Sequence, residues 1–291
     1  MRPEAGPVLG TELAPAKVNL CLFVGPTRAD GRHELVTVMQ PLAFGDDVSM
    51  EESARDEVVC DGVDGPNLAE AALRAFREAA GGAPMRLTIA KRTPVAAGMG
   101  GGSADAGAAL RLAARAAGVD DEPLLLRIAE RLGADVPAQL RPARVLAAGA
   151  GEQLVALGPA PRFGVVVVPS AQQLSTADVY AEADRLGLPR SEDDLAERLA
   201  AVREGLDRGP FGLADALLVN DLEPAARSLC PSIGDELAAV RAAGADHAMV
   251  SGSGPTVIGL FADPAAARSA AATIQRPGPA AIATEPFEAA A

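Results

Sequence analysis

The amino-acid sequence predicts an α+β fold built in two halves. Its 291 residues suit one large domain or two ordinary ones. With 49% hydrophobic and 22% charged residues, the composition is that of a globular chain with a sizeable core. Segments typical of strands and helices follow one another without the strict alternation of a parallel βαβ sheet, and this order favours α+β. The break is expected near Arg141–Arg144, which gives domains of residues 1–142 and 143–291.

The first half combines strands with helices. Apolar and β-branched runs predict strands over residues 13–24, 35–49 (one or two strands), 57–61 and 85–90. A helix is expected to begin at Asn67, because apolar residues from Leu68 to Phe76 recur at helical spacing. An alanine-rich helix is expected from about Ser103, and another covers 124–132 and ends at Gly133.

The second half places a long helical region between strands. Two strand-like pieces flank the turn at 149–151, and a buried strand follows over 162–168. Residues 175–245 have a mostly helical pattern. Residues 247–261 predict a hairpin around 251–255, and a helix over 264–274 precedes a last strand near Ala280.

Charge and apolar pattern argue against several classes of protein. A net charge of −13 argues against binding to nucleic acid or to an anionic membrane surface. The longest apolar runs fall far short of the roughly 20 residues of a membrane helix. Residues 1–10 lack the pattern of a secretory signal, and three distant cysteines suit a reducing compartment. We therefore expect a cytoplasmic monomer or homodimer without nucleic-acid or membrane partners.

The most distinctive segment is rich in glycine and lies directly before the alanine-rich helix. In Gly98-Met99-Gly100-Gly101-Gly102-Ser103, glycines let the backbone approach a ligand closely and turn successive N–H groups toward an anion. The dipole at the start of the following helix favours the same anion. We interpret the segment as a phosphate-binding loop; the plain alternative is a flexible loop with Ser103 as an N-cap. A GK[ST] motif is absent, and Ser103 replaces the third glycine of GxGxxG.

Two charged residues and one turn each allow a structural and a functional interpretation. Asp135, in the segment 133–137, is either an N-cap of the next helix or a carboxylate presented for proton transfer. Lys17, one of two lysines among 26 basic residues, alternates with Asn19 on one face of a strand. That face is either the solvent side of an edge strand or the wall of a cleft. The turn 251–256 is either a simple hairpin loop or a second glycine-rich loop that packs against the first.

Taken together, these segments resemble motifs of the GHMP kinases, in the order in which that family has them. The matching pieces span nearly the whole chain and are 14–22 (APAKVNLCL), 30–35 (DGRHEL), 91–106 (KRTPVAAGMGGGSADA), 132–137 (LGADVP), 220–226 (NDLEPAA) and 251–261 (SGSGPTVIGLF). The resemblance implies a two-domain fold, with an N-terminal half like ribosomal protein S5 domain 2 and a ferredoxin-like C-terminal half.

The resemblance also implies a reaction. The AKVNL and LGADVP pieces together are typical of the branch of the family that acts on a cytidyl diphosphate ester of methylerythritol. ATP would phosphorylate the 2-hydroxyl of 4-diphosphocytidyl-2-C-methyl-D-erythritol, giving ADP and the 2-phosphate, in the non-mevalonate isoprenoid pathway. The alternatives are a GHMP kinase for another small alcohol (homoserine- or mevalonate-type) and a nucleotide-binding sensor without turnover. An NAD-dependent oxidoreductase fails on the missing third glycine.

By the same resemblance, individual residues receive roles. Asp135 would take the proton of the hydroxyl, and Lys17 beside it would offset the growing phosphoryl charge. ATP would be bound by Asn67, Lys91, Pro94, Val95, Ala96, Ala97, Gly98, Met99, Gly100, Gly101, Gly102, Ser103 and Ala104, with Ser103 near Mg²⁺. The cytidyl substrate would be bound by Asn19, Arg32, His33, Thr176 and Tyr180.

Two positions depart from the family pattern. Arg32 stands where the family usually has a tyrosine that stacks on cytosine. A guanidinium also stacks on a base, and Tyr180 would supply the opposing ring. Ala138-Gln139 replaces an aromatic pair after LGADVP. Both departures bear on the recognition of cytidine more than on the phosphoryl transfer.

Overall fold

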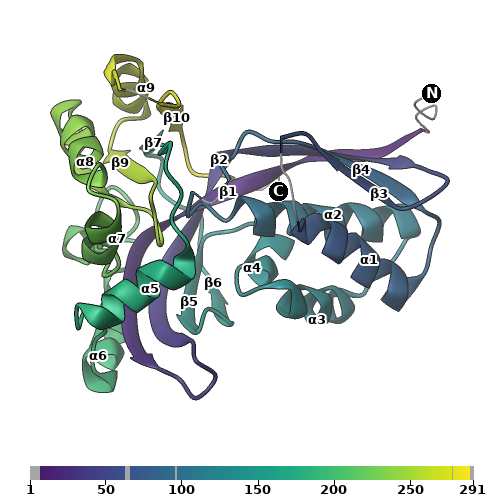
Figure 1. Ribbon diagram of the computed structural model, residues 1–291, viewed down its shortest axis with the longest axis horizontal. Helices are drawn as coiled ribbons and strands as arrows, with labels where there is room; N and C mark the ends of the chain where they lie inside the picture. The colour runs from purple at the N-terminus through teal and green to yellow at the C-terminus, as the bar shows by residue number, and fades with distance from the viewer. Residues whose placement is uncertain (1–6, 63–65, 96, 277, 289–291) are drawn as a thin grey trace. The chain divides into compact units, whose positions relative to one another are not determined.

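Figure 1 shows the computed structural model, which describes residues 7–62, 66–95, 97–276 and 278–288. The chain divides into two compact units. The first unit comprises Met1–Ala16, Phe44–Val95 and Gly100–Pro142; the second comprises Lys17–Ala43, Ala96–Met99 and Ala143–Ala291. The last passage of the chain from one unit to the other comes after Pro142. The units are not continuous segments, so the predicted domains of residues 1–142 and 143–291 stay a prediction. The earlier passages arise because two long strands and the glycine-rich loop each contribute residues to both units.

The two long strands are longer than the apolar pattern predicts. β1 (Val8–Thr27) and β2 (His33–Glu52) have 20 residues each and pair with one another. The sequence predicted the first only over 13–24, and left open whether the second was one strand or two. The added residues of β1 are mostly exposed or half-buried, so they pair through the backbone without the apolar alternation that marks a buried strand.

In the first unit, strands cover a layer of helices. β4 (Met85–Ala90) pairs antiparallel with Asp47–Glu52 of β2 and parallel with β3 (Glu57–Cys60). The helices of this unit are α1 (Leu68–Ala80), α2 (Gly101–Ala117), α3 (Glu122–Leu132) and α4 (Val136–Leu140). Figure 1 shows α1 and α2 side by side, with β3 and β4 lying over them.

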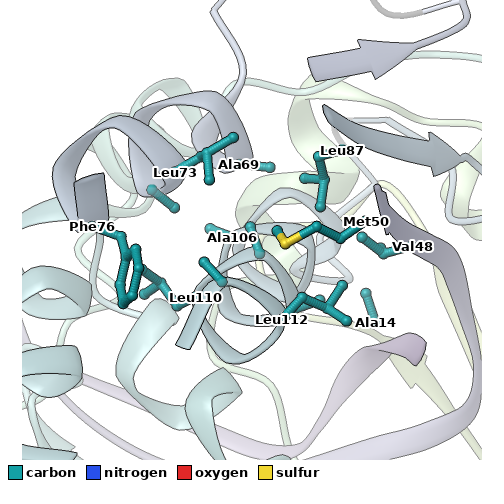
Figure 2. Close-up of a cluster of buried hydrophobic side chains, with 14 of the residues drawn as sticks. Ala14, Val48, Met50, Ala69, Leu73, Phe76, Leu87, Ala106, Leu110 and Leu112 are labelled. Atoms are coloured by element: carbon teal, nitrogen blue, oxygen red, sulfur yellow. The ribbon is translucent and has the colours of Figure 1, made fainter. Parts of the chain in front are cut away.

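The core of the first unit lies between these layers (Figure 2). Phe76 of α1 and Leu110 of α2 are fully buried there, together with Met50 of β2 and Leu87 of β4. The helical spacing that ends at Phe76 is therefore the buried face of α1, as the sequence predicted. α2 is buried over most of its circumference, because its many alanines let neighbouring elements approach closely.

The second unit contains the expected ferredoxin-like layer. β7 (Gly164–Val168), β8 (His247–Val250), β9 (Val257–Phe261) and β10 (Ile282–Thr284) form an antiparallel sheet in the order β10-β7-β9-β8. Helices α8 (Ile233–Ala242) and α9 (Pro264–Thr273) pack on it. The sequence of strands and helices with this pairing order is the split βαβ arrangement, so the ferredoxin-like C-terminal half that the resemblance implied is confirmed.

The remaining elements of the second unit surround this sheet or extend β2. β5 (Val145–Gly149) pairs with Leu35–Met39 of β2 and with β6 (Gln153–Ala156). The other helices are α5 (Thr176–Arg185), α6 (Glu192–Gly205), α7 (Glu223–Leu229) and the 3-10 helix η1 (Asp215–Leu217). Within the described ranges, no helix combines the length and the apolar character that crossing a membrane would require.

Candidate functional site

The glycine-rich loop ends at the start of α2 in a form suited to an anion. Gly100 is the N-cap residue, with a left-handed φ of 66°, and no side chain caps the helix. The first turn contains no acidic residue. The first backbone N–H groups of α2 therefore have no capping side chain, and they lie at the positive end of the helix dipole. The alternative in which Ser103 caps the helix is wrong, because the helix begins two residues earlier, at Gly101.

A triad of two buried carboxylates and one partly buried ammonium braces this start of α2 within the first unit. The ammonium of Lys91 lies 2.6 Å from Asp46 Oδ2 and 2.9 Å from Asp105 Oδ2. Asp46 also accepts hydrogen bonds from the backbone N–H groups of Arg92 and Thr93, at 2.6 and 2.7 Å. A Cβ added to Gly101 would lie 3.3 Å from the Lys91 ammonium. The triad therefore joins β2, the end of β4 and the second turn of α2.

The charges of this triad do not balance, because two carboxylates share one ammonium. Burial raises the pKa of Asp105 to about 7, although Lys91 opposes the shift. Burial acts to lower the pKa of Lys91, but the two carboxylates outweigh it and raise that pKa. The resemblance assigned Lys91 to the binding of ATP, and sequence reasoning did not single out Asp46 or Asp105. That role of Lys91 stays a prediction, and two of its three N–H donors are occupied by the carboxylates.

Asp135 lies in the turn between α3 and α4. It occupies the N-cap position of α4, but its backbone is helical, with φ −87° and ψ −14°, and its side chain makes no capping hydrogen bond. The interpretation of Asp135 as a capping aspartate is therefore wrong. Asn67, in contrast, does cap its helix: its Oδ1 accepts a hydrogen bond from Ala69 N at 2.8 Å. The predicted contacts of Asn67, Pro94 and Val95 with ATP stay predictions.

In the second unit, Lys17 belongs to a buried hydrogen-bond network. Its side chain donates to Asn19 Oδ1 at 3.0 Å, and Asn19 Nδ2 donates to Thr37 Oγ1 at 2.7 Å. Thr37 in turn donates to the carbonyl of Cys21 at 2.6 Å. Lys17 is only 8% exposed, so the interpretation as the solvent face of an edge strand is wrong. The network fixes the direction of the ammonium relative to β1 and β2.

The two glycine-rich segments meet inside the second unit, as one interpretation of the turn 251–256 predicted. A Cβ on Gly98 would lie 2.6 Å from the carbonyl oxygen of Ser251. A Cβ on Gly252 would lie 3.2 Å from both Asn19 Oδ1 and the carbonyl oxygen of Gly98. Asn220 holds the turn from the other side, since its Nδ2 donates to Val250 O and Gly252 O at 2.8 Å each. The backbone N–H of Lys17 donates to Met99 O at 2.9 Å.

A second group of predicted residues gathers around His33. Its Nε2 lies 2.8 Å from Asp184 Oδ1 and 3.2 Å from Thr27 Oγ1, and its ring centroid lies 5.1 Å from that of Tyr180. Sequence reasoning found His33 and Tyr180 but missed Asp184, which carries no motif.

Arg32 and Thr176, two further predicted residues, lie at separate positions of the second unit. The guanidinium of Arg32 is bound to Asp30 Oδ2 at 2.9 and 3.1 Å. The backbone N–H of Arg32 and then its guanidinium lower the pKa of Asp30. Thr176, the first residue of α5, shares a hydrogen bond with Ser253 at 3.1 Å. Ala96, predicted to contact ATP, lies outside the described residues.

Two models of known protein families match this chain. "GHMP kinases N terminal domain" matches residues 67–141, and "GHMP kinases C terminal" matches residues 199–280. The first match contains the start of α2, the triad residues Lys91 and Asp105, and Asp135; the second contains the turn 251–256. The chain belongs to the GHMP kinases.

Within that family, the chain is similar to 4-diphosphocytidyl-2-C-methyl-D-erythritol kinases. A 4-diphosphocytidyl-2-C-methyl-D-erythritol kinase of Anaeromyxobacter dehalogenans is 42% identical over 275 residues, which cover 90% of this chain and 84% of that protein. A crystal structure of 4-(cytidine 5'-diphospho)-2C-methyl-D-erythritol kinase has a TM-score of 0.79 and 32% identity, and it covers 96% of this chain and 100% of that one. A homoserine kinase from Cytophaga hutchinsonii shares the fold, with a TM-score of 0.62, 19% identity and 89% of each chain covered.

The charge imbalance of the triad gives a prediction for stability at pH 8. Asp46→Asn is expected to lower the free energy of unfolding by about 2–3 kcal/mol, because charge-assisted bonds from Lys91 and two backbone N–H groups are weakened together. Asp105→Asn is expected to cost less than about 1 kcal/mol, because it leaves one carboxylate for one ammonium. Urea unfolding of the two variants beside the unchanged protein measures both values. A larger loss for Asp105→Asn than for Asp46→Asn would contradict this account of the triad.

Proposed function

We propose that this protein is a kinase that uses ATP to phosphorylate the 2-hydroxyl of 4-diphosphocytidyl-2-C-methyl-D-erythritol, giving ADP and the 2-phosphate, in the non-mevalonate isoprenoid pathway. The observation that carries the proposal is 42% identity to a kinase of that name over 90% of this chain. A nucleotide-binding sensor without turnover is disfavoured, since both proposed catalytic residues, Lys17 and Asp135, are present. The kinase acts in the cytoplasm as a monomer or homodimer, on a small molecule and not on nucleic acid.

The phosphate groups of ATP bind along the glycine-rich loop. An N-terminus with a glycine cap and no acidic first-turn residue supports this part, since it offers N–H groups and a positive dipole to an anion. Ser103, in the first turn of α2, is the residue that would hold Mg²⁺. When bound with the nucleotide, that ion would neutralise charge on the phosphates. The close packing of Gly98 and Gly101 supports a backbone held in one conformation before ATP binds.

Asp135 and Lys17 act on the reacting groups. Asp135 takes the proton of the 2-hydroxyl as its oxygen attacks, and its place in the turn between α3 and α4 is consistent with that task. The ammonium of Lys17 stabilises the negative charge of the transferred phosphoryl group. Its hydrogen bond to Asn19 supports the role, because a buried lysine whose direction is fixed loses little entropy when a phosphoryl group arrives. Phosphoryl transfer needs little else than such positioning and charge stabilisation.

The cytidyl end of the substrate binds at Asn19, Arg32, His33, Thr176 and Tyr180. His33 and Tyr180 already face one another at 5.1 Å, which supports an aromatic surface beside the base. Arg32 contributes the flat face of its guanidinium in place of the usual tyrosine. Its two bonds to Asp30 hold that plane in one orientation, so part of the entropic cost of stacking is met before the base binds.

The first prediction of this proposal concerns substrate choice. ADP release with ATP, Mg²⁺ and 4-diphosphocytidyl-2-C-methyl-D-erythritol is expected to be rapid, while homoserine and mevalonate in its place should give only background release. Turnover of another alcohol but not of the cytidyl substrate would keep the kinase and reject the substrate. Binding of ATP without turnover of any alcohol would favour the sensor.

A second prediction concerns the base. Asp135→Asn is expected to lower kcat by at least about a hundredfold, the lower bound for a lost general base, and to leave ATP binding unchanged. Single-turnover phosphorylation and calorimetric titration with ATP measure the two quantities. The control is Asp121→Asn, since Asp121 caps α3 and asparagine is an equally good cap. Near-normal turnover of Asp135→Asn would remove Asp135 from the reaction.

A third prediction concerns Arg32. Arg32→Ala is expected to raise the KM for the cytidyl substrate by about fivefold to thirtyfold with little change in kcat, as for a lost stacking contact made equally before and during the reaction. Arg208→Ala serves as the control, because Arg208 is an exposed arginine of the same unit that pairs with Glu204 at 3.5 Å. An unchanged KM would show that Arg32 does not contact the base.

A further inference from the structure

We infer that Arg111, at the middle of α2, is a positioning residue for Asp135: it holds α4, the short helix that follows Asp135, in the place the reaction needs. The inference rests on the proposed function, in which Asp135 is the base. Its contacts all lie within the first unit, and no motif of the sequence pointed to Arg111. The structure supports it in three steps, which concern the length of α4, its contact with Gly107 and its bond to Arg111.

The first step is that α4 cannot hold itself in place. It has five residues, Val136–Leu140, which is too short for stable helical structure on its own. Asp135 directly precedes it, so any shift of α4 moves the carboxylate. Val136 is fully buried and anchors the beginning of the helix in the core. The other end, at Gln139 and Leu140, needs a partner of its own, because the last carbonyl groups of a helix lack intrahelical donors.

The second step is a backbone contact at Gly107. A Cβ added to Gly107 would lie 2.5 Å from the carbonyl oxygen of Gln139 and 2.8 Å from its carbonyl carbon. Both are backbone atoms, so they cannot move aside as the tip of a flexible side chain does. The missing side chain of Gly107 thus lets α4 lie directly on α2, and it sets the distance between them.

The third step is that Arg111, one helical turn after Gly107, binds the same carbonyl group. Its Nη1 donates to the carbonyl oxygen of Gln139. Its Nε and Nη2 bind Glu12 Oε1 of β1, at 2.8 and 2.6 Å. The planar guanidinium therefore joins β1, α2 and the end of α4. The carbonyl at the end of a helix also carries partial negative charge, which a cation stabilises.

Arg115 supplies an internal control. It lies one turn further along α2 and binds the same carboxylate, with Nη2 2.7 Å from Glu12 Oε2. Within the part of the chain that the structure describes, Arg115 forms no hydrogen bond or ion pair with α4. Loss of either arginine removes a partner of Glu12, but only loss of Arg111 removes the bond to Gln139. A general effect on stability should appear in both variants, and an effect on Asp135 in one.

The test compares Arg111→Met with Arg115→Met. Arg111→Met is expected to lower kcat at least about tenfold with both KM values changed less than about twofold, because a misplacement of about 1 Å is worth up to about a hundredfold in rate. Arg115→Met is expected to keep kcat. A kcat of Arg111→Met within twofold of the unchanged protein overturns the inference. An equal fall of kcat in Arg115→Met also overturns the inference. So does a result in which Arg111→Met raises KM and leaves kcat unchanged.

A double variant separates positioning of the base from a wider effect. If Arg111 acts through Asp135, adding Arg111→Met to Asp135→Asn should change the residual turnover less than about twofold, because the group being positioned is already gone. A further tenfold loss in the double variant overturns the inference. Asp135→Asn alone tests the proposed function: normal turnover there rejects Asp135 as the base. If Asp135→Asn loses most of its turnover but Arg111→Met turns over normally, only the role of Arg111 is rejected.

Gly107→Ala keeps the inference testable should Arg111→Met fail to fold. Its new Cβ would push the Gln139 carbonyl, and therefore α4, away from α2. The expected result is again a fall in kcat of at least about tenfold with unchanged KM values. Gly234→Ala in α8 is the matched control, since a Cβ there would meet only the tip of Arg227 at 3.8 Å. An unchanged kcat in Gly107→Ala overturns the inference.

Discussion

Close approach of one backbone segment to another, at positions where only glycine fits, is the constraint on which much of this structure depends. In the second unit, Gly98 lies against the turn 251–254, where a Cβ would come within 2.6 Å of a carbonyl oxygen. In the first unit, Gly107 lies against Gln139, where a Cβ would come within 2.5 Å. Backbone atoms cannot yield as the ends of side chains can, so each contact fixes a separation within its unit. The glycine-rich loop before α2 depends on the first contact, and the turn that carries Asp135 depends on the second.

The glycine-rich loop shows how one segment is fixed separately on its two sides. Residues before Gly100 belong to the second unit, where Met99 accepts a hydrogen bond from the backbone of Lys17. Residues from Gly100 onward belong to the first unit, where the triad of Lys91, Asp46 and Asp105 packs beneath the first turns of α2. Each side is therefore tied to a different core. A flexible loop loses conformational entropy when it binds any ligand, and a loop held on both sides loses less.

Sequence reasoning found the elements whose signal is local and missed the partners that are distant. The spacing from Leu68 to Phe76 predicted α1, and the alanine-rich run predicted α2, two residues short of its start at Gly101. The glycine-rich segment before α2 predicted a phosphate-binding loop, which stays a prediction. Lys17 was open to two interpretations, because its burial depends on contacts the strand pattern does not contain. Asp46 lies 45 residues from Lys91, and Glu12 lies 99 residues from Arg111. The sequence around Asp46 or Glu12 contains no sign of the distant cation that the fold brings to each of them.

The two lysines of the chain show why basic residues are not interchangeable here. Among 26 basic residues only Lys17 and Lys91 are lysine. Lys17 is buried and Lys91 is partly buried, and both ammonium groups are hydrogen-bonded. Lys91 places one nitrogen within 3 Å of two carboxylates that are themselves nearly fully buried, a space suited to a compact ammonium. Arg111 has the opposite task, since it must reach a carboxylate and a carbonyl in different directions at once. A single ammonium nitrogen cannot hold both acceptors in the spread geometry of a planar fork. The choice of cation at each position thus follows from the number and placement of the acceptors around it.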